Sequence, residues 1–149
     1  MTIPTYETVV LKARDGARFS AYAVRAANPS GAGIVMLPGG RGLLPIYAEI
    51  ADRFANTGID AVAIDHFGRS AGLGMRDDKF EFAPHLAKTS PEYTKQDVAA
   101  ALEYLRSGTG ARVRAAFTIG FSFGEGRRFC RLGMPNIDWP GSSAVTDGR

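Results

Sequence analysis

The chain has 149 residues, of which 45% are hydrophobic and 22% are charged. These values exclude a wholly disordered chain, and the length corresponds to one domain that can bury a core of its own. The net charge of +3 comes from scattered basic residues without a block of about five like charges, so nucleic-acid binding is not indicated.

The first elements predicted along the chain are a β-hairpin and a buried strand. Residues 5–13 and 17–25 are rich in strand-forming residues, and the Asp15-Gly16 pair between them is typical of a hairpin turn. In residues 17–25 apolar and polar side chains alternate, which predicts one face turned to water. Residues 33–37 form a continuous apolar run, which indicates a strand buried on both faces.

A helix and a second apolar strand are expected next. The helix should run from about Pro45 to Thr57, because proline suits its first turn and Gly58 ends it. Its predicted apolar stripe consists of Ile46, Ile50 and Phe54. Residues 59–64 predict the strand, after which Asp65 opens a loop.

The following part predicts a long irregular loop over 66–89, a second helix and a further strand. Ser90 suits the N-cap of this helix and Pro91 its first turn, and the helix should run to about Arg106. Its apolar stripe consists of Val98, Leu102 and Leu105. The last predicted strand spans 113–119.

This order of strands and helices indicates an α/β fold. Strands that alternate with helices imply crossover connections and a mostly parallel sheet with helices on both faces. The N-terminal hairpin adds an antiparallel edge to that sheet.

The pentapeptide Gly120-Phe121-Ser122-Phe123-Gly124 directly follows the last strand and matches G-x-S-x-G. In a nucleophile elbow of this pattern, the serine stands on a sharp strand-to-helix turn and the glycines leave room for the backbone. The helix that follows directs N–H groups at a developing oxyanion. Ser122 is therefore the candidate nucleophile. The alternative is a glycine-rich strand exit whose serine only caps a helix.

A second glycine-rich segment, residues 37–42 (LPGGRG), follows the earlier buried strand. An oxyanion hole takes one N–H from the residue after the nucleophile, here Phe123, and one from an upstream loop. Gly40 is the candidate for this second donor. The segment matches no glycine-rich phosphate motif, which counts against a nucleotide-binding domain. A plain strand-to-helix turn is the alternative.

Together these features resemble the dienelactone hydrolase family of α/β-hydrolases. The resemblance covers residues 15–124 and rests on the order and spacing of the hairpin, the GIVMLPGGRG segment, the two helices and GFSFG. It implies hydrolysis of an ester or lactone by Ser122, with the N–H groups of Phe123 and Gly40 as oxyanion hole and without a metal or organic cofactor. It also implies that Arg69 contacts a substrate carboxylate; a surface arginine is the alternative.

The sequence departs from this family in its catalytic partners. The acidic residue that helps to activate the nucleophile in the best-known members is replaced by Gly39, which favours a serine mechanism. α/β-Hydrolases place the triad acid and histidine after the serine, but no histidine follows Ser122. The resemblance puts neither His66 nor His85 in the triad, although His66 follows a strand end and stays open as a base.

The last part of the chain does not continue the family pattern. Arginines occupy the helix that should lie buried under the elbow, and the residues after it show no periodicity. We expect either a truncated, frame-shifted sequence or a natural short homologue with another ending. The chain is therefore divided into 1–124, the N-terminal part of an α/β-hydrolase domain, and 125–149, an irregular tail.

The leading prediction is thus a serine-type ester or lactone hydrolase that acts on a small molecule. The alternative is a catalytically inactive fragment or a non-enzymatic binding domain without the triad acid and histidine. The single cysteine, Cys130, and the lack of a signal-peptide pattern or a long apolar run predict a cytoplasmic protein without a membrane span. A sheet that ends at the elbow strand would expose an edge, so we expect self-association there.

Overall fold

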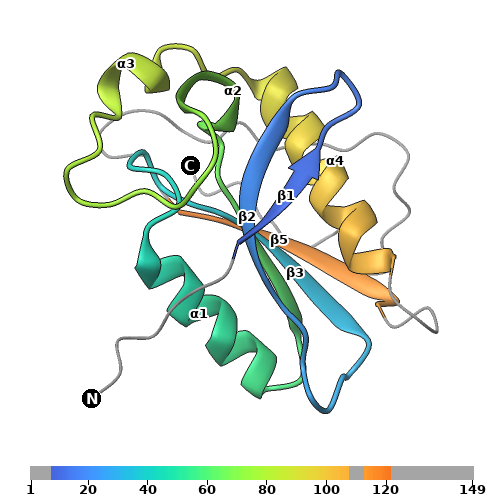
Figure 1. The fold of residues 1–149 in the computed structure, drawn as a ribbon. Helices are drawn as coiled ribbons and strands as arrows, with labels where there is room; N and C mark the ends of the chain where they lie inside the picture. Colours follow the sequence, from blue (N-terminus) through green and yellow to red (C-terminus); the bar gives the residue numbers. More distant parts are fainter. Residues whose placement is uncertain (1–7, 108–112, 122–149) are drawn as a thin grey trace, which may run out of the picture.

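The computed structural model describes residues 8–107 and 113–121, and its elements follow the predicted order (Figure 1). Ser122, Phe123 and the segment 125–149 lie outside the described residues. The strands are β1 (Thr8–Lys12), β2 (Arg18–Val24), β3 (Ala32–Leu37), β4 (Asp60–Ile64) and β5 (Ala115–Gly120). The helices are α1 (Pro45–Asn56), α2 (Gly68–Ala71), α3 (Ala83–Leu86) and α4 (Pro91–Arg106).

The five described strands form one sheet in the order β1-β2-β4-β3-β5. Strand β3 pairs in parallel with β4 on one side and with β5 on the other. Strand β2 pairs antiparallel with β1 and with β4, so among these five strands only β2 runs in the opposite direction. The predicted α/β class, the mostly parallel sheet and the N-terminal hairpin are confirmed.

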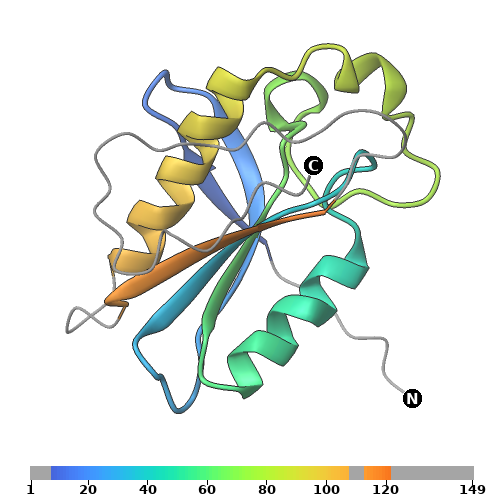
Figure 2. The same ribbon diagram turned by 180° about the vertical axis from the view of Figure 1, so that it is seen from behind.

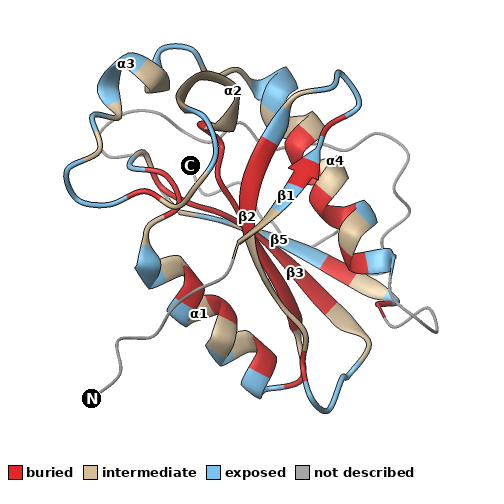
Figure 3. Cartoon of the chain, viewed as in Figure 1, coloured by how far each residue is buried: buried red, intermediate tan, exposed pale blue. Residues whose placement is uncertain are grey.

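Helices α1 and α4 cover opposite faces of the sheet, which Figures 1 and 2 show from the two sides. Successive side chains of β3 and β4 point to opposite faces, and both sets are buried. Val35, Val62 and Ile64 pack with the α4 stripe in one core cluster. Ile34, Met36, Ala61 and Ala63 pack with α1 in the other. The red strands in Figure 3 show that the centre of the sheet is buried throughout.

Helix α4 agrees with its prediction in both its start and its buried side. The Ser90 hydroxyl accepts a hydrogen bond from the Tyr93 N–H at 3.2 Å, as expected of an N-cap residue. Val98, Leu102 and Leu105 are all buried in the core. The predicted stripe is therefore confirmed, since residues spaced three and four apart lie on one face of a helix.

Helix α1 corrects the predicted stripe. Its buried residues are Ala48, Ala51 and Ala55, whereas Ile46 is 50% exposed. Ile50 and Phe54 lie beside the contact and are only partly buried. Small alanine side chains let the helix approach the sheet closely, so the larger side chains are displaced to its flanks.

The predicted water-facing side of β2 is found only in part, because Arg18 is exposed whereas Ser20 is buried and Tyr22 is half-buried. Ser20 is 1% exposed, and its hydroxyl accepts a hydrogen bond from the Gly74 N–H at 2.7 Å. Tyr22 is half-buried, and its hydroxyl donates to Asp52 on α1 at 2.6 Å. The hydroxyl groups of Ser20 and Tyr22 are therefore hydrogen-bonded to other segments of the chain.

The segment 66–89 is not wholly irregular, because it contains the short helices α2 and α3. Helix α2 begins at Gly68, which packs against the backbone of β2. A Cβ added at Gly68 would lie 2.5 Å from the Phe19 Cβ and 2.6 Å from the Phe19 Cα. Glycine at this position therefore allows the close approach of the two elements.

Candidate active site

Strands β3, β4 and β5 end at the same edge of the sheet, since these three strands are parallel. In open α/β sheets ligands bind in the crevice beyond the carboxyl ends of the strands. The glycine-rich segment 37–42 lies at this edge, and β5 ends there at Gly120, the first residue of the other segment. The edge is therefore the place where a site can be assembled.

The pairing of β3 with β5 continues up to the predicted elbow. Leu37 lies opposite Gly120, and the Phe121 N–H donates a hydrogen bond to the Leu37 carbonyl at 3.0 Å. Ser122 is the next residue in the chain. The position of Ser122 and Phe123 stays a prediction, but the strand that leads to them is fixed to the strand that leads to Gly40.

Gly40 lies in a tight turn after β3. The Gly42 N–H donates to the Gly39 carbonyl at 3.0 Å and closes the turn around Gly40. The Gly39 N–H donates to the Tyr47 hydroxyl of α1 at 2.9 Å, and the Tyr47 ring lies edge-on to Phe121 with centroids 5.0 Å apart. No described residue accepts a hydrogen bond from the Gly40 N–H. This N–H is suited to bind an oxygen of a ligand.

A buried ion pair lies beside this turn. Asp65 is fully buried directly after β4, and its Oδ2 accepts hydrogen bonds from Arg76 Nε at 3.1 Å and Nη2 at 2.7 Å. Burial raises the pKa of Asp65, while the Arg76 guanidinium acts against this rise. An acidic residue at the end of an apolar strand is a visible signal for Asp65, but no pattern in the sequence singles out Arg76 or Tyr47.

The two histidines occupy different environments near this edge. His66 is 5% exposed, and its ring packs edge-on against Phe67 with centroids 4.3 Å apart. Burial, together with the nearby Arg76 charge, lowers the pKa of His66 to about 4. His66 is therefore neutral at pH 7. His85 on α3 shares a hydrogen bond between its Nδ1 and the Ser70 hydroxyl at 2.8 Å.

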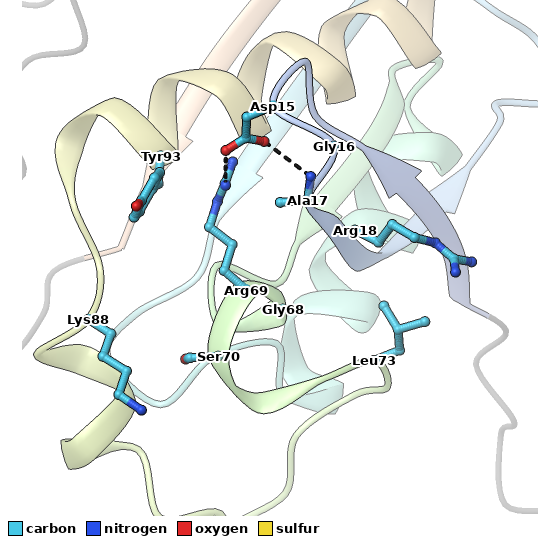
Figure 4. Close-up of a pocket in the computed structure, with 10 residues that line it drawn as sticks. All are labelled: Asp15, Gly16, Ala17, Arg18, Gly68, Arg69, Ser70, Leu73, Lys88 and Tyr93. Carbon is cyan, nitrogen blue, oxygen red and sulfur yellow. Dashed lines mark hydrogen bonds and ion pairs between the residues drawn. The ribbon is translucent and has the colours of Figure 1, made fainter.

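Arg69, predicted to bind a substrate carboxylate, contacts two carboxylates of the chain itself. It donates to buried Asp97 on α4 at 2.9 Å. It also donates to exposed Asp15 in the hairpin turn, as Figure 4 shows. Its guanidinium lies over the Tyr93 ring, 4.4 Å from the centroid. Burial raises the pKa of Asp97 to about 6 although Arg69 opposes this shift, and the hydrogen bond from Arg69 lowers the pKa of Asp15.

Arg69 borders an open depression of about 670 Å³. The described residues that line it are Asp15, Gly16, Ala17, Arg18, Gly68, Arg69, Ser70, Leu73, Lys88 and Tyr93 (Figure 4). None of them belongs to the Gly40 turn or to β5. Gly40, the predicted oxyanion donor, is therefore not among the described residues that line the depression beside Arg69.

The dienelactone hydrolase family model matches residues 19–129. The chain belongs to the dienelactone hydrolase family. The family predicted from the sequence is thus confirmed, and the match includes β2 through β5 together with the G-x-S-x-G segment. No curated protein matches this dienelactone hydrolase family member.

Solved structures share the fold with this dienelactone hydrolase family member at low identity. The protein m3DLH has a TM-score of 0.60 and 22% identity, with 78% of this chain and 49% of that chain covered. A dienelactone hydrolase-like promiscuous phosphotriesterase from metagenomic libraries has a TM-score of 0.57 and 22% identity, with 79% of this chain and 50% of that chain covered. The Pyrococcus furiosus esterase Pf2001 has a TM-score of 0.54 and 16% identity, with 78% of this chain and 42% of that chain covered. The chain therefore spans half or less of each of these proteins.

Two further properties concern cofactors and membranes. Within residues 8–107 and 113–121, no three His, Cys, Asp or Glu side chains gather in a way that could hold a metal ion. None of the helices described in this range is long and apolar enough to cross a membrane.

We predict that burial of neutral His66 makes the stability of the dienelactone hydrolase family member depend on pH. An unfolded histidine has a pKa of about 6.5, so between about pH 4 and 6.5 the unfolded chain binds the extra proton. The free energy of unfolding should therefore be highest above pH 6.5 and fall by about 3 kcal/mol towards pH 4 through this residue. Urea unfolding of the wild type and of His66→Gln at both pH values measures the difference.

The matched variant for this prediction is Asp97→Asn. The raised pKa of Asp97 has the opposite sign, since the folded state holds the proton between about pH 3.8 and 6 and gains stability as the pH falls. Asp97→Asn should therefore make the free energy of unfolding fall more steeply as the pH is lowered, whereas His66→Gln should make it fall less steeply. Equal pH dependence in the wild type and in His66→Gln would contradict the assignment to His66.

Proposed function

We propose that this member of the dienelactone hydrolase family hydrolyses carboxylic esters or lactones through a serine nucleophile. Ser122 Oγ attacks the carbonyl carbon and gives its proton to water, the N–H groups of Phe123 and Gly40 hold the oxyanion, and the alcohol leaves with a proton from water. A water molecule then hydrolyses the acyl-serine, which releases the acid and restores the Ser122 hydroxyl. The observation that carries the proposal is the hydrogen bond from the Phe121 N–H to the Leu37 carbonyl. It joins the strand before Ser122 to the strand before Gly40.

The reach of the two segments supports this assignment. Gly40 is three residues beyond Leu37, and Ser122 is one residue beyond Phe121. The turn closed by the bond from Gly42 to Gly39 keeps Gly40 close to the end of β3. A fixed backbone donor at the oxyanion is worth about 10²–10³ in kcat.

The alternative is a catalytically inactive fragment or a non-enzymatic binding domain. The observation that favours it is the state of the histidines: the lowered pKa makes His66 a weak base, and His85 is engaged with Ser70. No histidine follows Ser122 in the sequence. The two functions differ in turnover, which one assay measures.

Replacement of the predicted nucleophile, Ser122→Ala, should abolish hydrolysis of 4-nitrophenyl acetate by the chain. The oxyanion hole without a nucleophile leaves only a small residual rate, so the rate of Ser122→Ala should be at least about 10³-fold below that of the wild type. The matched control is Ser107→Ala, which removes an exposed serine at the end of α4, outside the motif and outside the depression beside Arg69, and should keep the wild-type rate. If the wild type and Ser122→Ala both turn over at the rate of buffer alone, the non-enzymatic alternative holds.

We propose in addition that Arg69 binds the carboxylate of an anionic substrate in the depression of Figure 4. Asp15 is exposed, so an incoming carboxylate can replace it, while buried Asp97 holds the other side of the guanidinium. Arg18 and Lys88 add positive charge to the same rim.

The variant Arg69→Met should raise the KM for 4-nitrophenyl hemisuccinate by about tenfold, since a carboxylate–guanidinium contact is worth about 1.5–3 kcal/mol. The KM for uncharged 4-nitrophenyl acetate should stay within about twofold, because Arg69 is not assigned to the reacting carbonyl. Arg53→Met, which removes an exposed arginine of α1 that does not line this rim, is the matched control and should leave both KM values unchanged. An equal change in KM for both esters would show that Arg69 stabilises the fold and does not bind the substrate carboxylate.

We also propose self-association through β5 and a cytoplasmic location. The sole cysteine fits a reducing compartment.

Strand β5 is the last of the described strands on its side of the sheet, and Phe117 on it is 49% exposed. An apolar strand edge of this kind is a template for pairing with another chain.

Light scattering over a concentration series should detect a dimer or larger assembly of the chain. Phe117→Lys should weaken this association by about tenfold or more, because lysine on a strand edge opposes pairing and a central aromatic contact is lost. Val10→Lys is the control, since Val10 is 44% exposed on β1 at the opposite side of the described sheet. A monodisperse monomer at all concentrations would contradict the proposal.

A further inference from the structure

Three buried residues from separate segments form a closed network next to the Gly40 turn. Asp65 Oδ1 accepts a hydrogen bond from the Leu43 N–H at 3.4 Å, and its Oδ2 accepts two from the Arg76 side chain. The Arg76 backbone N–H donates to the Leu43 carbonyl at 2.8 Å. Asp65 and Leu43 are fully buried, and Arg76 is 8% exposed. Leu43 is thus held from both of its backbone polar groups.

We propose that Arg76 is a positioning residue that, through Asp65 and Leu43, fixes the Gly40 turn in the orientation required of an oxyanion donor. This inference rests on the proposed function. It adds a role for a residue that touches neither the nucleophile segment nor the Gly40 N–H in the described structure.

The Arg76 stem forms part of the wall against which the turn packs. A Cβ added at Gly42 would lie 2.9 Å from the Arg76 Cγ and 2.9 Å from the Phe67 Cδ2. Gly42 has a φ of +83°, a conformation that glycine adopts without steric cost. The glycines of the turn therefore leave its backbone flexible, and packing against Arg76 restricts that flexibility.

The contacts of the Arg76 head group leave it no role as a substrate ligand. Besides Asp65, it donates to the carbonyls of Gly72 and Ala71, and it lies 4.7 Å from the centroid of the Phe80 ring. A buried ion pair keeps its place only when its remaining donors are hydrogen-bonded in this way. Its planar fork also fixes direction, which a lysine ammonium does not.

Amide hydrogen exchange of the full chain tests the proposal without relying on activity. Arg76→Met keeps an apolar stem but removes the fork, so exchange in residues 39–44 should become at least about tenfold faster, as loss of a hydrogen bond to a charged group predicts. Exchange in α1 and in β3 should change much less. The change must be local to support a positioning role.

The matched control is Arg25→Met. Arg25 pairs with Asp60 at 3.2 Å, at the start of the same strand β4 that Asp65 follows, so this variant also removes an arginine–aspartate pair from one end of β4. It should leave exchange in residues 39–44 unchanged. Equal acceleration in both variants, or none in Arg76→Met, would overturn the proposal.

A measurement on the wild type decides the matter if Arg76→Met does not fold. The amides of Leu43 and Arg76 should exchange together and at least about tenfold more slowly than the Gly40 amide, because both donate within the network. Arg76→Lys gives a second variant, which keeps the charge without the fork and should accelerate the same residues. A Leu43 amide that exchanges as fast as that of Gly40 would show that the network does not hold the turn.

An activity arm separates this inference from the proposed function. If Ser122→Ala abolishes turnover, Arg76→Met should lower kcat by about tenfold or more with little change in KM, as expected for a donor that acts in the transition state. If Ser122→Ala has no effect, the proposed function fails, while the exchange data still decide whether Arg76 holds the turn. A rise in KM alone, with kcat unchanged, would contradict the positioning role.

Discussion

Strand β3 hydrogen-bonds in parallel to β4 and to β5, and this double pairing determines where everything else in the described structure lies. Parallel neighbours cannot be joined by a tight turn, so the chain crosses over through α1 between β3 and β4 and through α4 between β4 and β5. The two crossovers bury both faces of the sheet. They also bring the carboxyl ends of three strands to one edge, where the described turn around Gly40 and the end of β5 at Gly120 lie.

Rigidity at this edge has to come from outside the glycine-rich turn itself. Glycines give the backbone room to approach a substrate, but they also leave it many conformations. The Tyr47 hydroxyl binds the turn at Gly39, and the Asp65–Arg76 pair binds it at Leu43. Burial of two charges is costly, and the hydrogen bonds to neighbouring carbonyls offset that cost. A flexible sequence is thus held by contacts from three other segments.

The parts of the fold that follow local patterns could be predicted, and those that depend on packing partners could not. The apolar run of β3 and the Ser90 cap of α4 are local signals, and both are found in the structure. The predicted stripe of α1 was wrong at Ile46, because periodicity does not reveal that alanines face the sheet. Alternation in β2 did not show that a loop covers Ser20. Arg76 lies in a segment without a motif, and only the fold brings it to Asp65.

Two arginines near this edge illustrate why a motif and a structure select different residues. The resemblance to the dienelactone hydrolase family predicts Arg69 as a carboxylate ligand, whereas no motif or resemblance points to Arg76. Both bind carboxylates, but Asp15 beside Arg69 is exposed and can exchange with water or another anion. Asp65 beside Arg76 is fully buried and also bound to Leu43, so its loss would leave an uncompensated charge inside the protein. The proposals of binding at Arg69 and of positioning by Arg76 therefore rest on how readily the carboxylate partner of each arginine can be exchanged.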